Sequence, residues 1–270
     1  MREAVIVSVA RTPIGKAYRG AFNDLSAPTL AAVAVKAAVE RAGIDVNEID
    51  DCIFGAALTQ GNQGMNFVRQ VAMAAELPVS VAGMTIDRQC SSGLMSIATA
   101  ANHIVCDGAN VVIAGGCDSI SLVQNDKMNM HRAVDPSVKA YRPAIYMPML
   151  DTAEIVANRY EISRAEQDAY ALKSQQRTAA AQAANKFDDE IVPVTATKLV
   201  MDKATGDISK EEVTLIKDEG NRPSTNIEGL SGLKAVKDNG TITGGNASQL
   251  SDGAAAVVVM ERALAEERGL

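Results

Sequence analysis

Short apolar runs alternate with segments of helical period along the first 118 residues. Residues 4–10 (AVIVSVA) are rich in Val and Ile and precede the loop-forming segment 11–13 (RTP), which predicts a buried strand. Residues 30–41 repeat apolar side chains at helical spacing, with Pro28 suited to a first helical turn and Gly43 to a stop. The same criteria predict further strands at 51–58, 84–87 and 110–114, and further helices at 67–77 and 91–105.

The pattern changes after residue 118. Residues 119–149 are irregular, contain several Met and Pro residues, and are locally basic in an acidic chain. A capping box at 163–166 (SRAE) then marks the start of a long helix. The elements predicted for the rest of the chain are a helix at 164–186, a pair of strands at 191–200 and 211–216, and a buried strand at 254–260.

Strands that alternate with helices of this length favour right-handed crossovers and a mainly parallel sheet. We therefore expect an α/β fold in which residues 1–118 and 244–270 form a five-stranded mixed sheet with helices on both faces. Residues 119–243 are expected to be an inserted α+β loop domain between the fourth and fifth strands.

The composition limits the classes of function. Hydrophobic residues make up 47% of the 270 residues and charged residues 22%, which argues against long disordered segments. The formal net charge of −7 provides no overall basic field to attract nucleic acid or an anionic membrane, so an anionic ligand needs a local basic patch. No apolar run approaches the roughly 18 residues of a membrane helix, and the first residues do not resemble a signal peptide. We expect a cytoplasmic protein with neither nucleic acid nor membrane as a partner.

One of the four cysteines lies where chemistry is favoured. Cys90 lies between a predicted strand and a predicted helix, so the free N–H groups and the dipole of the first helical turn face it. Such a position favours a thiolate nucleophile; the alternative is a small buried side chain at a helix start. Cys52, Cys106 and Cys117 lie in or beside apolar segments or helix ends and are expected to be structural. No metal site is expected, because four cysteines and two histidines lack close ligand spacing.

Eight segments resemble the motifs of one enzyme family, in the same order. Residues 87–93 (DRQCSSG) resemble NxxCxSG, the acyl-accepting cysteine motif of the thiolases, which are acetyl-CoA acyltransferases. The other segments that resemble thiolase motifs are RTPIG at 11–15, GNQGMNFVRQ at 61–70, GGCDSIS at 115–121, MLDTAE at 149–154, SRAEQDA at 163–169, DEGNRP at 218–223 and GGNASQLSDGA at 244–254. The resemblance implies a thiolase-like N-terminal domain whose insertion is the CoA-binding loop domain.

The resemblance also implies acyl transfer in two halves. Cys90 would attack an acyl-CoA thioester and hold the acyl group, and a second substrate would then take it, forming or cleaving a 3-ketoacyl-CoA such as acetoacetyl-CoA. By motif, Arg222 and Ser248 are expected to contact the adenine and pantetheine portions of CoA, and Gly244 and Met149 to line the tunnel. For Arg222 the alternative is a surface ion pair with residues 218–219. The resemblance further implies CoA and acyl-CoA as substrates, no tightly bound cofactor, a role in fatty acid metabolism and a homo-oligomer, either a dimer or a tetramer.

Departures from the thiolase pattern concern proton transfer. In thiolases a histidine in a GHPxGxSG segment activates the nucleophile and a second cysteine in a CxGGGxG segment moves a proton, and neither segment occurs here. His103 is thirteen residues from Cys90 on one predicted helix, roughly 20 Å away, and His131 falls in the irregular loop. Asp87 replaces the usual Asn, and Pro148 stands where many biosynthetic thiolases have His. We therefore expect the N-terminal portion of a thiolase, inactive by itself.

Two other interpretations stay open. One is a short subunit or acyl-CoA-binding module that a separate chain completes. The other is a condensing enzyme of the ketoacyl synthase type, which shares the fold and the position of the cysteine. Ketoacyl synthases lack segments like those at 149–154 and 244–254, which argues against the second interpretation.

Overall fold

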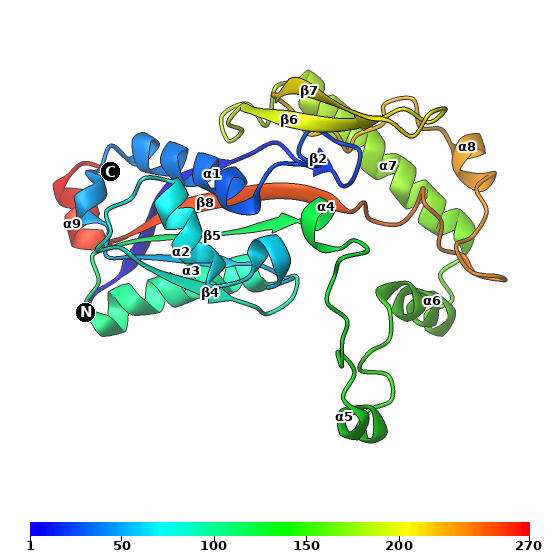
Figure 1. Cartoon of the computed structure of the whole chain (residues 1–270), viewed down its shortest axis with the longest axis horizontal. Helices are drawn as coiled ribbons and strands as arrows, with labels where there is room; N and C mark the ends of the chain where they lie inside the picture. Colours follow the sequence, from blue (N-terminus) through cyan, green and yellow to red (C-terminus); the bar gives the residue numbers. More distant parts are fainter. The chain divides into compact units, whose positions relative to one another are not determined.

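The computed structural model describes residues 1–270, which divide into two compact units (Figure 1). The first unit consists of Met1–Met128, Asp188–Gly220 and Leu250–Leu270. The second consists of Asn129–Phe187 and Asn221–Gln249. The chain therefore passes from one unit to the other after residues 128, 187, 220 and 249.

The first unit is built on a mixed sheet of five long strands. Their order across the sheet is β1 (Ala4–Arg11), β8 (Ser251–Glu261), β5 (Val111–Ser119), β3 (Asp51–Gly55) and β4 (Ala82–Ile86). β3 is parallel to both of its neighbours, whereas β8 is antiparallel to β1 and β5. A two-residue strand, β2 (Gly15–Lys16), also pairs with β8. The predicted five-stranded mixed sheet is confirmed, with β2 as an addition.

Helices cover both faces of this sheet. α1 (Ala27–Ala42) and α2 (Phe67–Ala74) pack on one face with the larger buried apolar cluster, and α3 (Ser92–Asn102) packs on the other (Figure 1). Pro28 lies in the first turn of α1, and Gly43 follows its last residue with a left-handed φ of 63°, as predicted. Shorter elements of this unit are the 3₁₀ turns Val46–Glu48 and Gly61–Gln63, a π-helical turn His103–Asp107, α4 (Ile120–Val123) and α9 (Arg262–Glu267).

A two-stranded hairpin also belongs to the first unit. It consists of β6 (Val194–Met201) and β7 (Ile208–Leu215), which pair antiparallel as predicted. Val194 is buried in the same apolar cluster as α1, and the Asn23 side chain bonds both the N–H and the C=O of Leu199, each at 2.9 Å.

The boundaries between the two units differ from those of the expected insertion, 119–243. Residues 188–220 pack with the sheet because the hairpin buries apolar side chains there. The first unit also extends to residue 128, and the second extends to residue 249 rather than 243.

The second unit is mainly helical. Its helices are α5 (Pro136–Tyr141), α6 (Met149–Arg159), α7 (Arg164–Ala183) and α8 (Ile227–Ser231). α7 begins at the predicted capping box, in which Ser163 N–H donates to Glu166 Oε2 (2.8 Å) and Glu166 N–H donates to Ser163 Oγ (3.3 Å). Glu154 of α6 accepts the N–H groups of Thr241 and Ile242 (2.8 and 2.9 Å), which fixes the segment after α8. None of the chain's helices combines the length and apolarity that a membrane span requires.

Candidate active site

Cys90 lies in a tight turn between β4 and α3. The residue before it, Gln89, is in the left-handed region with a φ of 50°, and α3 begins two residues after it, at Ser92. The side chain of Cys90 is exposed. The structure thus places an accessible thiol at the strand-to-helix junction that the sequence predicted.

A cavity of about 310 Å³ adjoins Cys90. Its walls are the ends of β3, β5 and β8 and the start of α3. A Cβ atom at Gly55 would collide with the backbone of Ser92 and Gly93, and one at Gly116 would lie 3.2 Å from the Cα of Gly93. Glycine at these positions therefore lets the start of α3 approach the sheet, which brings Cys90 to the strand ends. The other lining residues are Arg11, Ile14, Gln89, Cys117, Asp118, Ser251, Gly253, Ala254 and Ala255.

Asp118 also lines this cavity. Its Oδ1 accepts from Gln63 Nε2 (2.9 Å) and from the Ala57 N–H (3.1 Å). Gln63 is only 1% exposed, and its Oε1 accepts the N–H of Ser119 (2.5 Å). Burial raises the pKa of Asp118 despite these donors, and the charge of nearby Asp87 adds to the rise. Asp118 and Gln63 lie in motif-like segments, but neither is among the site residues predicted from the sequence.

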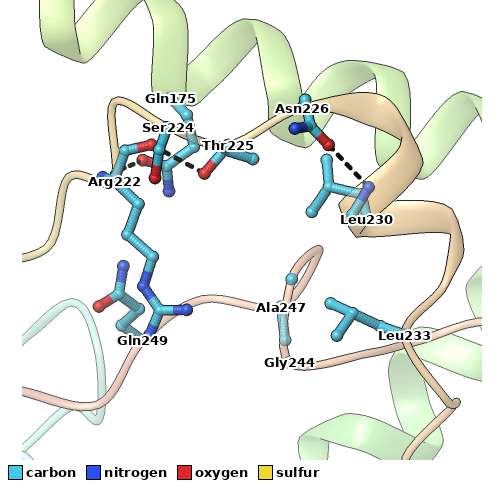
Figure 2. Close-up of a pocket in the computed structure, with 12 residues that line it drawn as sticks. Gln175, Arg222, Ser224, Thr225, Asn226, Leu230, Leu233, Gly244, Ala247 and Gln249 are labelled. Atoms are coloured by element: carbon cyan, nitrogen blue, oxygen red, sulfur yellow. Dashed lines mark hydrogen bonds between the residues drawn. The ribbon is translucent and has the colours of Figure 1, made fainter.

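A second pocket, of about 270 Å³, lies within the second unit (Figure 2). Two of the residues expected to bind CoA, Arg222 and Gly244, both line it. Ser248 does not line it, although its neighbours on both sides do, and Met149 lines a different pocket of about 340 Å³ between α6 and α7. The other lining residues of the Arg222 pocket are Gln175, Ser224, Thr225, Asn226, Gly229, Leu230, Leu233, Gly245, Ala247 and Gln249.

Arg222 is the one charged residue among those that line this pocket. Its backbone N–H donates to Gln175 Oε1 (2.8 Å), and its C=O accepts from Thr225 Oγ1 (2.8 Å), so the backbone is held on both sides. Figure 2 shows its side chain extending across the pocket toward Gln249. The arrangement offers one guanidinium group, several amide and hydroxyl groups and two leucine side chains to a ligand.

The alternative expected for Arg222 is an ion pair with Asp218 or Glu219. In the structure both carboxylates have other partners. Arg11 binds both carboxylate oxygens of Asp218, at 2.8 and 3.0 Å. Glu219 accepts the N–H of Lys16 at 2.8 Å. Both carboxylates are therefore engaged within the first unit.

Residues 4–263 match the family model of the thiolase N-terminal domain. The chain belongs to the thiolase family. It is 44% identical over 271 residues to a 3-ketoacyl-CoA thiolase of Bacillus subtilis (strain 168), an alignment that covers 100% of this chain and 68% of the relative. It is 41% identical over 280 residues to an acetyl-CoA acetyltransferase of Paracoccus denitrificans, covering 100% of this chain and 68% of the relative. It is also 41% identical over 271 residues to a peroxisomal 3-ketoacyl-CoA thiolase 2 of Arabidopsis thaliana. That alignment covers 99% of this chain and 57% of the relative.

The other three cysteines of this thiolase chain differ from Cys90. Cys52 and Cys117 are buried, and burial raises the pKa of each thiol. Cys106 is exposed and lies at a helix end, where the sequence placed it, and its structural role stays a prediction. It belongs to the π-helical turn at the end of α3, past the last buried residue, Ile104.

Neither histidine of the thiolase chain lines the cavity beside Cys90. His103 follows the last residue of α3, whereas Cys90 precedes the first. Its Nδ1 lies 3.6 Å from Asp51 Oδ2, and its Nε2 lies 3.9 Å from Asp107 Oδ2. His131 belongs to the second unit, where its backbone N–H donates to Asn129 Oδ1 (3.0 Å).

Proposed function

We propose that Cys90 is the acyl-accepting nucleophile of an acyltransferase that forms or cleaves 3-ketoacyl-CoA. The observation that carries the proposal is the exposed thiol of Cys90 beside a cavity at the start of α3, in a chain of the thiolase family. In the cleavage direction the Cys90 thiolate attacks the C3 carbonyl, the C2–C3 bond breaks with its electron pair on C2, and C2 takes a proton to give acetyl-CoA. The thiol of free CoA then loses its proton, attacks the acyl-cysteine and releases acyl-CoA.

The Arg222 pocket is our candidate for the CoA site. Arg222 supplies a positive charge for a phosphate-bearing ligand in a chain whose net charge is −7. Leu230 and Leu233 supply an apolar wall, and Gly244 leaves open space, because a Cβ there would meet nothing within 4 Å. CoA and acyl-CoA enter this proposal as substrates, without a tightly bound cofactor.

Ser248 and Met149 stay proposed as further CoA contacts. Ser248 lies between two residues that line the Arg222 pocket, Ala247 and Gln249. Met149 is 75% exposed at the start of α6 and lines the other pocket of the second unit. Their proposed roles rest on the thiolase motifs that contain them.

We further infer that these 270 residues do not complete a catalytic site alone. Deprotonating the thiol and the incoming acetyl group requires acid–base groups within about 3 Å of the reacting atoms. His103 lies past the far end of α3, and the two thiolase segments assigned to proton transfer do not occur in the sequence. A short subunit completed by a separate chain fits the same observations.

The experiment that tests this function measures loss of the enolate absorbance of acetoacetyl-CoA with purified chain and free CoA. We expect no appreciable thiolysis from the 270 residues alone. Activity should appear when the region with the GHPxGxSG and CxGGGxG segments of a relative is supplied, covalently or in trans, and should vanish with Cys90→Ala. Turnover in the usual enzyme range, about 1 to 1,000 per second, from the 270 residues alone would contradict the inference of an incomplete site.

A homo-oligomer or a partner chain is also proposed. On the α3 side of the sheet, Ile6 pairs with Val259 of the α3 cluster yet is 51% exposed, and Leu94 of α3 is 73% exposed. Exposed apolar surface of this kind favours association. Sedimentation over a range of concentrations tests it, and a monomer at all concentrations without a partner would contradict it. A cytoplasmic location and a role in fatty acid metabolism are proposed from the sequence.

A further inference from the structure

The turn that carries Cys90 contains one backbone conformation that needs support from its surroundings. Gln89 has a φ of 50°, in the left-handed region, which is uncommon for residues other than Gly, Asn and Asp. Such a residue keeps this conformation only where its neighbours hold it. Because Gln89 directly precedes Cys90, its backbone sets the direction in which the chain presents the thiol.

Two side chains hold the two ends of Gln89. Asp87 Oδ1 accepts the Gln89 N–H at 2.9 Å. The Ser92 hydroxyl donates to the Gln89 C=O at 2.6 Å and accepts the Arg88 N–H at 2.8 Å. The Gln89 C=O also accepts the backbone N–H of Ser92 at 3.0 Å. The amide and the carbonyl of the left-handed residue are therefore both bound to side chains. We call Asp87, Gln89 and Ser92 the Cys90 clasp.

The two supporting side chains differ in burial. Ser92 is 3% exposed, and its backbone lies so close to Gly55 that a Cβ there would collide with it. Asp87 is exposed. Ser92 thus ties the clasp to the sheet, whereas Asp87 can be replaced without opening the core.

We propose that Asp87 and Ser92 are positioning residues that hold Gln89 left-handed and thereby keep the Cys90 thiol directed at its cavity. The proposal rests on the proposed role of Cys90, but its effect is measured on the thiol without any substrate. In this proposal Asp87 acts as a hydrogen-bond acceptor. Asparagine can therefore replace Asp87, and alanine cannot. The competing explanation is charge, since Asp87 also acts electrostatically on Asp118.

The test is competitive labelling of the whole chain with substoichiometric iodoacetamide, followed by peptide mapping of all four cysteines. Cys106 is exposed and serves as the reference thiol in the same sample. Cys52 and Cys117 are buried, so their labelling reports unfolding. The measured quantity is the ratio of Cys90 to Cys106 labelling in the wild type and in the variants Asp87→Asn, Asp87→Ala and Ser92→Ala.

We expect Asp87→Ala and Ser92→Ala to lower this ratio about two- to tenfold, the usual range for losing one hydrogen bond. Asp87→Asn should keep the wild-type ratio. In a Gln89→Gly background the effect of Asp87→Ala should shrink, because glycine adopts a positive φ without support. If Ser92→Ala unfolds the chain, labelling of Cys52 and Cys117 will show it. The variants of exposed Asp87 then still test the proposal.

Three results would overturn the proposal. One is an unchanged ratio in Asp87→Ala in a folded chain. Another is an Asp87→Asn variant that behaves like Asp87→Ala, which would make charge the cause. The third is an Asp87→Ala effect of equal size in the Gln89→Gly background. A wild-type Cys90 that is labelled more slowly than Cys106 would instead count against the proposed nucleophile, so the two failures are distinguishable.

Discussion

The Cys90 cavity and the Arg222 pocket are built in opposite ways. Strand ends and the first turn of α3 form the walls of the Cys90 cavity. A Cβ at Gly55 would collide with the backbone of α3, and one at Gly116 would make a tight contact with Gly93. Short helix α8 and the loops beside it form much of the wall of the Arg222 pocket, with amide, hydroxyl and leucine side chains around one cation. A rigid frame suits the placement of one reacting atom, whereas adaptable polar side chains suit a flexible anionic ligand. We therefore expect changes near Cys90 to alter reaction and changes near Arg222 to alter binding.

The largest expected effect separates these two roles. In an enzyme completed with the proton-transfer region of a relative, Cys90→Ala should lower kcat by about 10³-fold or more, because no other group can form the acyl intermediate. Arg222→Gln in the same enzyme should mainly raise KM. Steady-state kinetics of acetoacetyl-CoA thiolysis measures both. A Cys90→Ala enzyme that kept a tenth of its turnover would contradict the assignment of the nucleophile.

A smaller effect is expected for CoA binding to the chain itself. Arg222→Gln should weaken binding about tenfold, since it removes a charge-assisted hydrogen bond at an exposed site. Titration calorimetry with free CoA measures the change. Arg177→Gln is the matched control, because Arg177 is an exposed arginine of α7 that does not line the pocket. Equal losses in the two variants would mean that general charge, rather than this pocket, attracts CoA.

Gly244 offers a steric test of the same pocket. A Cβ there meets nothing within 4 Å, so Gly244→Ala should change the free energy of unfolding by less than about 0.5 kcal/mol. It should nevertheless weaken CoA binding severalfold, because the methyl group occupies pocket volume. Gly245→Ala is the contrast, since its Cβ would lie 2.6 Å from side-chain atoms of Leu230 and Leu233. Unchanged CoA affinity in Gly244→Ala would place the ligand elsewhere.

The smallest expected effect concerns Asp118 and its dependence on pH. Burial raises the pKa of Asp118 above its ordinary value of 3.8. At pH values between these two pKa values, the folded chain therefore keeps a proton that the unfolded chain releases. This contribution to stability is present below about pH 3.8 and is lost as the pH rises through the raised pKa. Asp118→Asn keeps the Oδ1 acceptor for Gln63 and Ala57 and should therefore raise Tm by about 2 °C at pH 7 but not at pH 4. Thermal melts at the two pH values decide, and an equal shift at both would rule out titration as the cause.

The fold was largely predictable because its strands are continuous apolar runs. Residues 254–260 lie inside the sheet as β8, between β1 and β5. Residues 4–10 form the edge strand β1, where Ile6 and Val9 stay about half exposed, so the apolar run predicted the strand but not its place at the edge. The unit to which the hairpin belongs could not be read from the sequence. Its strands follow the ordinary period of two, which gives the exposed and buried faces but not the surface that covers the buried one.

The candidate site was predictable only where one local segment determines it. Cys90 follows from its position between a strand and a helix. Asp118 reaches the Cys90 cavity from β5, opposite Gly253 of β8, and Gln63 reaches Asp118 through a buried side chain. No local sequence pattern encodes either contact. The left-handed Gln89 escaped prediction for a related reason, since glutamine has no preference for that conformation and tertiary hydrogen bonds hold it.

The most direct test of the central claim is to find the acyl group on the protein. The completed enzyme is mixed with acetyl-CoA, quenched with acid within its turnover time and digested for peptide mapping. Our account predicts an acetyl thioester on the peptide that contains Cys90, and none in Cys90→Ala. An acetyl group on Cys106 or another residue, or equal labelling in Cys90→Ala, would contradict it.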